Sequence, residues 1–183
     1  MTFAFTNIKS PEGIIVITPY VFNDERGFFM ETYRSDEYEK VGIKEEFIQD
    51  NHSRSTKGVI RGLHFQVDPT EQSKLVRCIA GEIFDVVVDL RRKSDSFGKW
   101  FGIVLSEENK KMLYVPKGFA HGYSTLSEEA EVVYKVDDYY SREDERGVLY
   151  NDPVLAIDWK VTNPIVSSKD KALPKFDREG DYF

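Results

Sequence analysis

Short strand-like segments, each closed by turn residues, constrain this chain more than any other feature. Gly, Pro, Asp or Asn lies at the end of most of these segments. Short strands at regular spacing are typical of a β-sandwich or β-barrel. The sequence therefore predicts an all-β fold with a few short helical turns. The segments are rich in Val, Ile, Phe and Tyr and cover residues 13–19, 28–33, 74–79, 82–90, 100–105, 112–115 and 131–134.

Helix signals are sparse and local. Residues 35–40 read as one or two turns, with Ser35 as the N-cap and Gly42 as the stop. Residues 167–172 predict a second short turn, ended by Pro174. Neither segment is long enough to add a helical layer to the fold.

The length of the chain and its uniform composition predict one domain. It has 183 residues, which lies within the usual range of a single domain, and we find no repeat, linker or low-complexity segment. We expect one domain over residues 1–183 with a core of about 13–174. The C-terminal tail, 177–183, is polar and is expected to be loosely held.

Charge and cysteine content exclude several classes of function. The net charge is −7, which argues against binding to nucleic acid or to an anionic membrane surface. A small anionic ligand would need a local basic cluster. The single cysteine, Cys78, precludes an internal disulfide or a thiolate metal cluster and fits a reducing cytoplasm. Its apolar neighbours predict a buried, inert thiol. Residues 1–11 lack the pattern of a signal peptide, and no apolar run is long enough for a membrane span.

The three histidines, His52, His64 and His121, each lie in a stretch dense with polar groups. If the stretch around His64 is extended, His64 shares a face with Gly62 and Gln66. A lone histidine in a β protein is more often structural than catalytic. The residues alone leave both roles open.

Lys74 and Tyr134 are polar groups on apolar strand faces. Lys74 shares its face with Val76 and Cys78, so its side chain either reaches an edge or points into a pocket. Tyr134 shares its face with two valines, and a buried phenol needs a hydrogen-bond partner. Core packing and a catalytic role again both fit.

An ordered set of motifs favours the catalytic roles over the structural ones. Together they resemble the dTDP-4-dehydrorhamnose 3,5-epimerase family, from about Gly13 to Pro174. The most specific are Arg-Gly-Leu-His at 61–64 and Pro-Lys-Gly-Phe-Ala-His-Gly at 116–122. The others lie at 22–29, 49–51, 58–66, 74–77, 85–91, 134–135 and 168–170.

The resemblance implies a cupin-like jelly roll, a homodimer and chemistry without a metal or cofactor. The implied substrate is a dTDP-linked 4-keto-6-deoxyhexose, which is inverted at C3 and C5 beside the ketone. His64 matches the base, and Asp170 matches the carboxylate that orients it. Lys74 matches the cation at the C4 oxygen, and Tyr134 matches the acid on the opposite face of the ring.

The resemblance also implies substrate-binding groups. Arg26 and Arg61 match residues that hold the nucleotide end, where a guanidinium suits phosphate oxygens. Further contacts are implied at Glu31, Gln49, Asp50, Asn51, His121, Glu145 and Lys169.

Several neighbouring residues are harder to assign. Asp85 matches a buried strand carboxylate, and a role in holding Lys74 or Tyr134 is a hypothesis. For four aromatic residues, stacking on the ligand and plain core packing fit equally. These are Phe28, Tyr114, Phe119 and Tyr140.

Two departures from the family pattern leave the exact activity open. Tyr123 stands where the family usually has Phe, and Ser168 stands where it usually has an acid. Neither removes a named catalytic group, but a single-carbon epimerase stays possible. So do a metal-dependent cupin enzyme and a non-catalytic sugar-nucleotide binder on the same scaffold.

Overall fold

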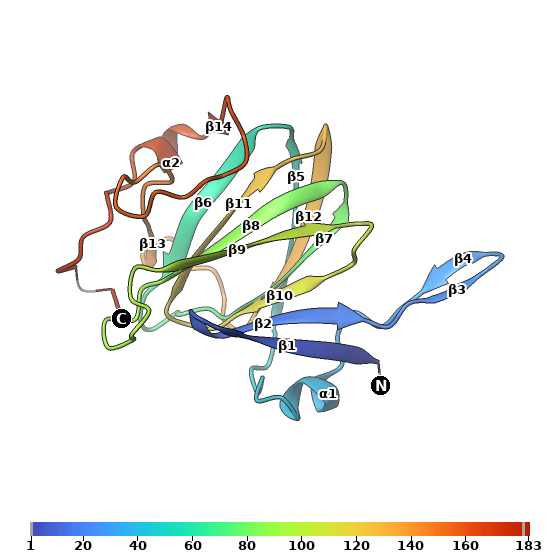
Figure 1. Cartoon of the computed structure of the whole chain (residues 1–183). Helices are drawn as coiled ribbons and strands as arrows, with labels where there is room; N and C mark the ends of the chain where they lie inside the picture. Colours follow the sequence, from blue (N-terminus) through green and yellow to red (C-terminus); the bar gives the residue numbers. More distant parts are fainter. Residues whose placement is uncertain (1, 181) are drawn as a thin grey trace.

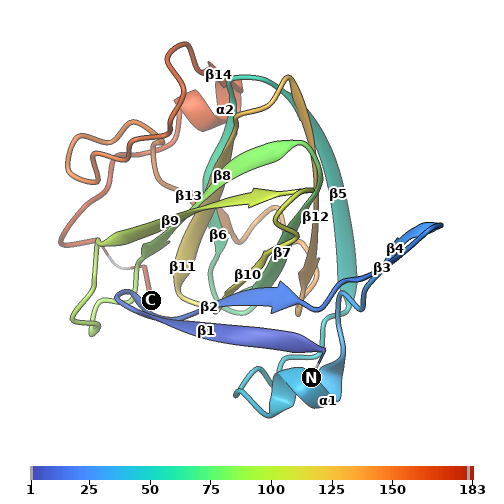
Figure 2. The same cartoon turned by 45° about the vertical axis from the view of Figure 1, so that its right-hand side comes forward.

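The computed structural model describes residues 2–180 and 182–183 and is built almost entirely from strands (Figure 1). Two antiparallel sheets face each other, as Figure 2 shows. The first has the order β1 (Phe3–Lys9), β2 (Glu12–Pro19), β10 (Met112–Val115), β7 (Lys74–Ala80), β12 (Glu129–Val136) and β5 (Gln49–Thr56).

The second sheet covers the opposite side of the barrel. Its order is β13 (Glu145–Gly147), β6 (Val59–Gln66), β11 (Phe119–Thr125), β8 (Glu82–Asp89) and β9 (Trp100–Ser106). A short strand, β14 (Ile165–Val166), adds to β6 in parallel. The all-β prediction is confirmed, and the two facing sheets form a cupin-like jelly roll.

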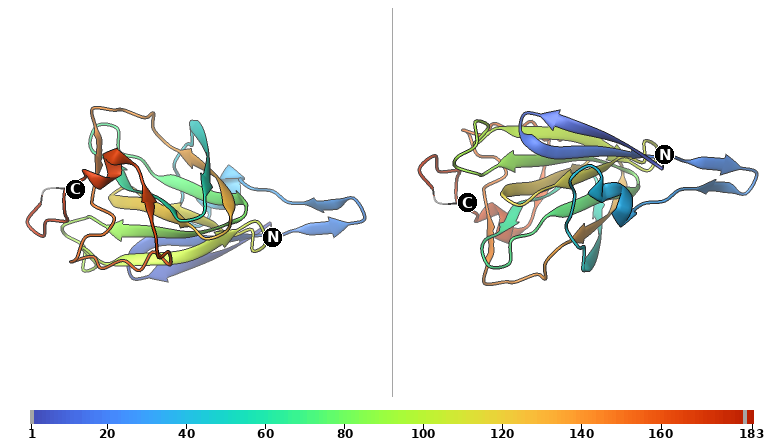
Figure 3. Two further views of the ribbon diagram at one scale, coloured as in Figure 1. Left: turned by 90° about the horizontal axis from the view of Figure 1, so that it is seen from above. Right: turned by 90° about the horizontal axis from the view of Figure 1, so that it is seen from below.

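A small hairpin stands apart from both sheets. It consists of β3 (Phe22–Asp24) and β4 (Gly27–Phe29), and it projects well away from the barrel (Figures 1 and 3). The predicted strand at 28–33 is therefore too long, because the ladder ends at Phe29.

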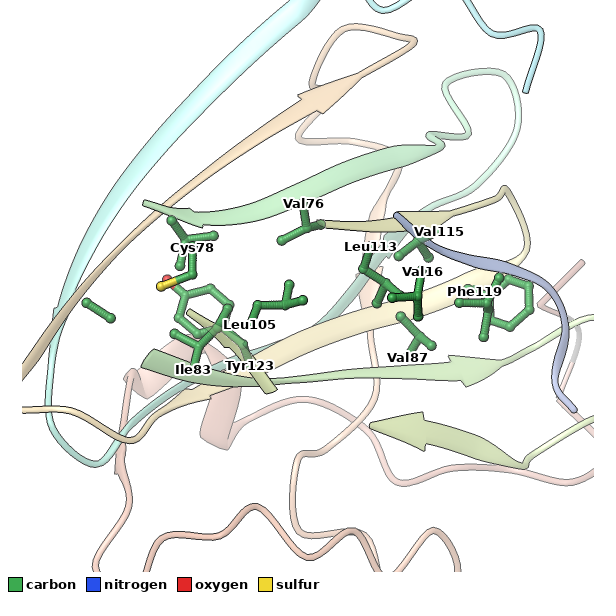
Figure 4. Close-up of a cluster of buried hydrophobic side chains, with 13 residues drawn as sticks. Val16, Val76, Cys78, Ile83, Val87, Leu105, Leu113, Val115, Phe119 and Tyr123 are labelled. Atoms are coloured by element: carbon green, nitrogen blue, oxygen red, sulfur yellow. The ribbon is translucent and has the colours of Figure 1, made fainter. Parts of the chain in front are cut away.

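The alternation of β8 explains both core layers. Ile83 and Val87 face the barrel interior, where Val76 and Leu113 of the first sheet meet them (Figure 4). The even positions of β8 face outward and are covered by a C-terminal segment that carries Trp159 and Phe176. Because both faces are buried, the strand is mostly apolar along its length, with Asp85 as the interruption.

Two short helices complete the chain, α1 (Ser35–Glu39) and α2 (Ser168–Lys171). The prediction of Ser35 as the N-cap of α1 is wrong. Arg34 holds the extended cap position, and no side chain caps the helix. In α2 the Ser167 hydroxyl accepts the Asp170 N–H at 3.0 Å, as an N-cap does.

The C-terminal tail is held more firmly than its polarity indicates. Tyr182 stacks on Phe176 with ring centroids 5.8 Å apart and planes 3° apart. Phe183 packs on Phe65 at 5.4 Å. Aromatic area outweighs the polar residues between them. Asp181 lies outside the described residues.

Two further observations concern the bulk of the chain. Cys78 is a free cysteine and is buried, as predicted, and burial raises the pKa of its thiol to about 11. Neither helix of residues 2–180 and 182–183 has the length and apolar character needed to cross a bilayer.

Candidate active site

Two adjoining cavities lie between the sheets. The larger, of about 490 Å³, is lined by residues of both sheets and of α2. The smaller, of about 120 Å³, reaches toward the 49–51 and 140–145 segments. His64, Lys74 and Tyr134 border both cavities. The structure therefore brings three of the four predicted catalytic residues to one place, and the fourth, Asp170, lines the larger cavity.

His64 and Asp170 form a partly buried pair. The His64 Nε2 lies 2.7 Å from the Asp170 Oδ1, and the Asp170 side chain is only 5% exposed. Burial alone would raise the pKa of Asp170. The hydrogen bond and charge of His64, with the Gly62 N–H, outweigh it and hold that pKa below its usual range. A carboxylate on Nε2 leaves Nδ1 as the free imidazole nitrogen.

Glycines allow the strands of this site to approach closely. Gly62 has φ +111°, and a Cβ there would lie 2.7 Å from the Gly122 Cα and from the His121 carbonyl oxygen. This contact explains why glycine precedes the Leu63–His64 pair in the Arg-Gly-Leu-His motif. It also places His121 of β11 directly opposite His64 of β6 in the ladder.

Lys74 and Tyr134 come from the first sheet and face His64 across the cavity. Burial lowers the pKa of Lys74 to about 8, against the opposing charges of Asp85 and Glu145. Burial also raises the pKa of Tyr134, so the phenol stays protonated near neutral pH. Within the described part of the chain, neither the ammonium nor the phenol has a hydrogen-bond partner.

His121 forms a second imidazole–carboxylate pair. Its Nε2 lies 3.0 and 2.9 Å from the two oxygens of Asp85, which is fully buried. The hypothesis that Asp85 holds Lys74 or Tyr134 therefore needs correction. Its hydrogen bond goes to His121, a diagonal neighbour in the β8–β11 ladder, while its charge still favours the protonated form of Lys74.

Polar side chains make up most of the lining of the smaller cavity, and Glu145 is among them. Lys169 donates to Glu145 at 2.5 Å, and the Tyr140 hydroxyl donates to the same oxygen at 2.7 Å. These hydrogen bonds outweigh burial and keep the pKa of Glu145 below its usual range. Gln49 donates to Asn51 at 2.9 Å on the same side.

Three predicted substrate-binding residues lie elsewhere. Asp50 points to the outer face of β5, where it accepts a hydrogen bond from Lys135, because side chains alternate along a strand. Arg26 sits at the tip of the projecting hairpin, 85% exposed and paired with Asp24. Glu31 follows that hairpin and contacts Arg34 at 4.0 Å, outside both cavities.

The four aromatic residues divide into two groups. Tyr114 and Phe119 are 5% and 3% exposed and belong to the core, so core packing holds for both. Phe28 lies on the hairpin, exposed except for Lys110 over its ring. Only Tyr140 borders a cavity of the site.

Sequence reasoning missed Ser53 as a lining residue of the larger cavity, and it noted Tyr123, which also lines that cavity, only as a departure from the family pattern. Ser53 follows Gln49 and Asn51 at alternate positions of β5, so the period of the strand was the available signal. Among the described residues, no group of three or more His, Cys, Asp or Glu side chains converges as metal ligands do.

Fold and site together define a jelly-roll enzyme equipped for proton transfer, with a histidine–carboxylate pair facing a lysine and a partly buried phenol. Residues 9–178 match the profile of a family described as dTDP-4-dehydrorhamnose 3,5-epimerase. The chain belongs to the dTDP-4-dehydrorhamnose 3,5-epimerase family, and its function is the epimerisation that serves dTDP-L-rhamnose biosynthesis.

Individual members of the family are similar to this chain over nearly its whole length. The enzyme of this name from Shigella flexneri is 54% identical over 171 residues, which cover 93% of this chain and 94% of that one. The crystal structure from Elizabethkingia anophelis superposes with a TM-score of 0.91 at 45% identity, over 96% and 97% of the two chains. The enzyme from Legionella pneumophila, crystallised with dTDP-4-keto-L-rhamnose, superposes with a TM-score of 0.89 at 44% identity. The match covers 96% of this chain and 99% of that one.

Proposed function

We propose that this epimerase converts dTDP-4-dehydro-6-deoxy-D-glucose to dTDP-4-dehydro-L-rhamnose with His64 as base and Tyr134 as acid. One observation carries the assignment. His64 belongs to one sheet and Tyr134 to the other, and both border the same two cavities. A ring held between them meets a base on one face and an acid on the other, which is what inversion at carbon requires.

The proposed proton transfer begins at His64. The C4 ketone makes the C3 and C5 hydrogens weakly acidic. With Asp170 accepting the Nε2–H, the Nδ1 lone pair takes the carbon-bound proton, and the imidazolium is stabilised by the carboxylate. The C–H electron pair moves into the enolate, with negative charge on the C4 oxygen.

Reprotonation completes the inversion from the other face. Tyr134 gives its phenolic proton to the same carbon, and the enolate electrons form the new C–H bond. The buried environment keeps the phenol protonated until it is needed. Exchange with solvent returns the proton to Tyr134 and removes it from His64 before the second carbon reacts.

Lys74 and His121 are proposed to bind the enolate oxygen. Both line the larger cavity, and Asp85 favours the ammonium form of Lys74. A positive donor at a developing oxyanion typically contributes about 10²–10³ in rate. The low exposure of His121 and Asp85 strengthens this interaction by excluding water.

Arg61 and Lys169 are proposed to hold the diphosphate. Both line the larger cavity and supply the positive charge that an anionic ligand needs in a protein with a net charge of −7. The Legionella relative contains a dTDP-linked 4-keto sugar in its crystal, which supports the same class of ligand here.

Substitution of His64 by Asn separates catalysis from binding. We expect His64→Asn to bind dTDP within a few-fold of the wild type, because the nucleotide groups remain. It should lose exchange of the C3 and C5 hydrogens with solvent. A wild type that binds but shows no exchange would instead favour a non-catalytic binder, and a tightly held stoichiometric metal would favour a metal-dependent cupin.

We also propose that the chain works as a homodimer in which Arg26 serves the partner's site. The hairpin carrying Arg26 projects from the barrel and exposes Phe22, Phe28 and Phe29 at 52%, 54% and 67% (Figure 3). Exposed aromatic area of this kind favours burial against a second copy. A hairpin that reaches the partner accounts for a substrate-binding arginine far from its own cavity.

Mixed dimers test this arrangement. Arg26→Ala and His64→Asn are each expected to be nearly inactive alone. In a mixed dimer, one site combines an intact His64 with the intact Arg26 of the other copy, so activity should return. Activity that never exceeds the sum of the separate variants would place Arg26 in its own subunit's function or in none.

A cytoplasmic location is proposed from the thiol. A single buried cysteine needs no oxidising compartment, and the substrate is a nucleotide sugar. Cell fractionation with an activity assay tests it, and activity confined to a secreted or membrane fraction would contradict it.

A further inference from the structure

Residues 137–144 join β12, which carries Tyr134, to β13, which begins at Glu145. In the described structure this segment contains no strand or helix, so no sheet ladder fixes its path. Tyr140 within the segment and Glu145 directly after it line the smaller cavity. The position of this cavity wall therefore depends on contacts that reach the segment from other elements.

The loop that joins β6 to β7 holds the two ends of the segment. Its hydrogen bonds run from the Ser73 N–H to the Asp137 Oδ1 at 2.6 Å, from the Gln72 Nε2 to the Asp138 carbonyl at 2.7 Å, and from the Val67 N–H to the Asp144 carbonyl at 3.1 Å. None of these contacts reaches the middle of the segment, where Tyr140 lies.

Gln66, two residues beyond His64 on β6, holds the middle. Its Nε2 donates to the Tyr139 carbonyl at 3.2 Å and to the Thr70 carbonyl at 2.6 Å. Its Oε1 accepts the Ser141 N–H at 2.7 Å. The amide therefore grips the backbone on both sides of the intervening tyrosine. Gln66 is only 5% exposed, so a buried amide spends all its hydrogen bonds on this link.

Tyr140 transmits the held position to both cavities. Its hydroxyl donates to the Glu145 Oε2 at 2.7 Å, and Lys169 donates to the same oxygen at 2.5 Å. Lys169 belongs to α2 and lines the larger cavity. A continuous chain of contacts thus leads from Gln66 through the segment to groups that line both cavities.

We propose that Gln66 is a positioning residue that holds Tyr140 and Glu145 in the arrangement that binds the dTDP-linked sugar. The proposal rests on the proposed function, because it takes the two cavities as the site of that ligand. The Gln66 amide has no free hydrogen for the ligand, since both are given to carbonyls. Without it the segment would hold the binding arrangement only part of the time, and apparent affinity falls by that fraction. The effect belongs to binding, because His64 and Tyr134 lie on strands.

Two substitutions separate the amide from its shape. Gln66→Met keeps the length of the side chain and removes all three contacts. Gln66→Glu keeps an acceptor for the Ser141 N–H but sets a carboxylate against the Thr70 and Tyr139 carbonyls. Burial favours the neutral form of the introduced carboxyl, and its O–H can donate to one carbonyl. The effect of Gln66→Glu should therefore weaken as pH falls.

Asn109→Leu is the matched control. The Asn109 amide also bridges three backbone groups, since it donates to the Val104 carbonyl at 2.9 Å and accepts the N–H groups of Ser106 and Lys111 at 3.2 and 3.0 Å. It lies in the turn between β9 and β10 and lines neither cavity. This variant loses a comparable set of contacts without reaching the site.

The test measures Kd for dTDP-glucose, which lacks the C4 ketone and is not epimerised, and kcat and KM for the dTDP-4-keto sugar. We expect Gln66→Met to raise Kd and KM about tenfold with kcat within about threefold of the wild type, as for a segment that is competent about a tenth of the time. Asn109→Leu should match the wild type. Relative to the wild type at each pH, the Kd of Gln66→Glu should be several-fold lower near about pH 5.5 than near about pH 8.

A Kd for Gln66→Met within about twofold of the wild type, or an equal rise in Asn109→Leu, would overturn the role of Gln66 and leave the proposed function intact. A fall in kcat at unchanged Kd would do the same. If Gln66→Met folds poorly, a Kd ratio for Gln66→Glu that does not vary with pH would overturn that role. A folded wild type that does not bind dTDP-glucose would instead overturn the proposed function.

Discussion

His64 and His121 stand opposite each other in register on β6 and β11, and each imidazole has a carboxylate at its Nε2. Their surroundings differ. The His64 side chain is 28% exposed, whereas that of His121 is 9% exposed and its partner Asp85 is fully buried. The more open imidazole can meet a carbon-bound proton, and the enclosed one is suited to a fixed oxygen.

Asp170→Asn tests the first pair. The amide carries no negative charge, and its NH2 group can donate to Nε2 and hold the imidazole in the wrong tautomer, so the imidazole loses a fixed acceptor and the charge that stabilises its protonated form. We expect kcat to fall by about 10²–10⁴ with dTDP binding retained. Kinetics and a binding titration check this. A loss of less than about threefold would contradict a role for Asp170 behind the base.

The basic limb of the pH profile should follow Lys74. Its ammonium must be charged to stabilise the enolate, and burial lowers its pKa to about 8. We therefore expect kcat/KM to fall as pH rises through about 8. Asp85 raises the pKa of Lys74, so Asp85→Asn should move this limb to lower pH. Lys74→Arg should move it upward.

The limb is measured as kcat/KM against pH for all three proteins. A limb that stays unchanged in Lys74→Arg would show that another group controls it.

Lys169→Met tests the diphosphate side. The ammonium is more than half exposed and is held toward the cavity by Glu145. Loss of one charged contact to a phosphate typically costs about 1.5–3 kcal/mol, or roughly 10–100-fold in binding. We expect KM to rise by this factor with kcat little changed. A fall in kcat at constant KM would instead place Lys169 in the chemistry.

Asp152→Ala tests what holds the C-terminal segment over the second sheet. This buried carboxylate accepts the N–H groups of Val154, Leu155 and Phe176 at 2.8, 3.1 and 2.9 Å. Removing it leaves buried donors unpaired, at about 1–3 kcal/mol each. We expect a free energy of unfolding lower by several kcal/mol in urea titrations, with Asp152→Asn less affected. An unchanged midpoint would contradict this role.

Strand period explains what could be predicted from the sequence. The inward positions of Lys74 and Tyr134 follow from the apolar residues on the same strand faces. Strand period groups His64 only with Gly62 and Gln66, so its direction rested on the family resemblance. The structure has all three at the cavities. The same rule, applied to residues 49–51, would have put Asp50 on the outer face. Asp50 was predicted to bind substrate because residues 49–51 were matched to the family motif together.

Long-range pairing explains what could not be predicted. The hydrogen bond between Asp85 and His121 depends on the register of β8 with β11, and the reach of Tyr123 to Ser53 depends on the distance between two sheets. No local pattern encodes either. Arg26 is a different case, because in the described structure its ion pair is with Asp24 of the same hairpin, and its proposed target lies in a second copy of the chain.

The most direct test of the central claim is the labelling of the dTDP-4-keto sugar by the wild-type enzyme in deuterated water, read at C3 and C5 separately. With His64 and Tyr134 acting on both faces, we predict deuterium at both carbons, and loss of both labels in His64→Asn. Label at a single carbon in the wild type, at any enzyme concentration, would contradict double epimerisation and identify a single-carbon epimerase.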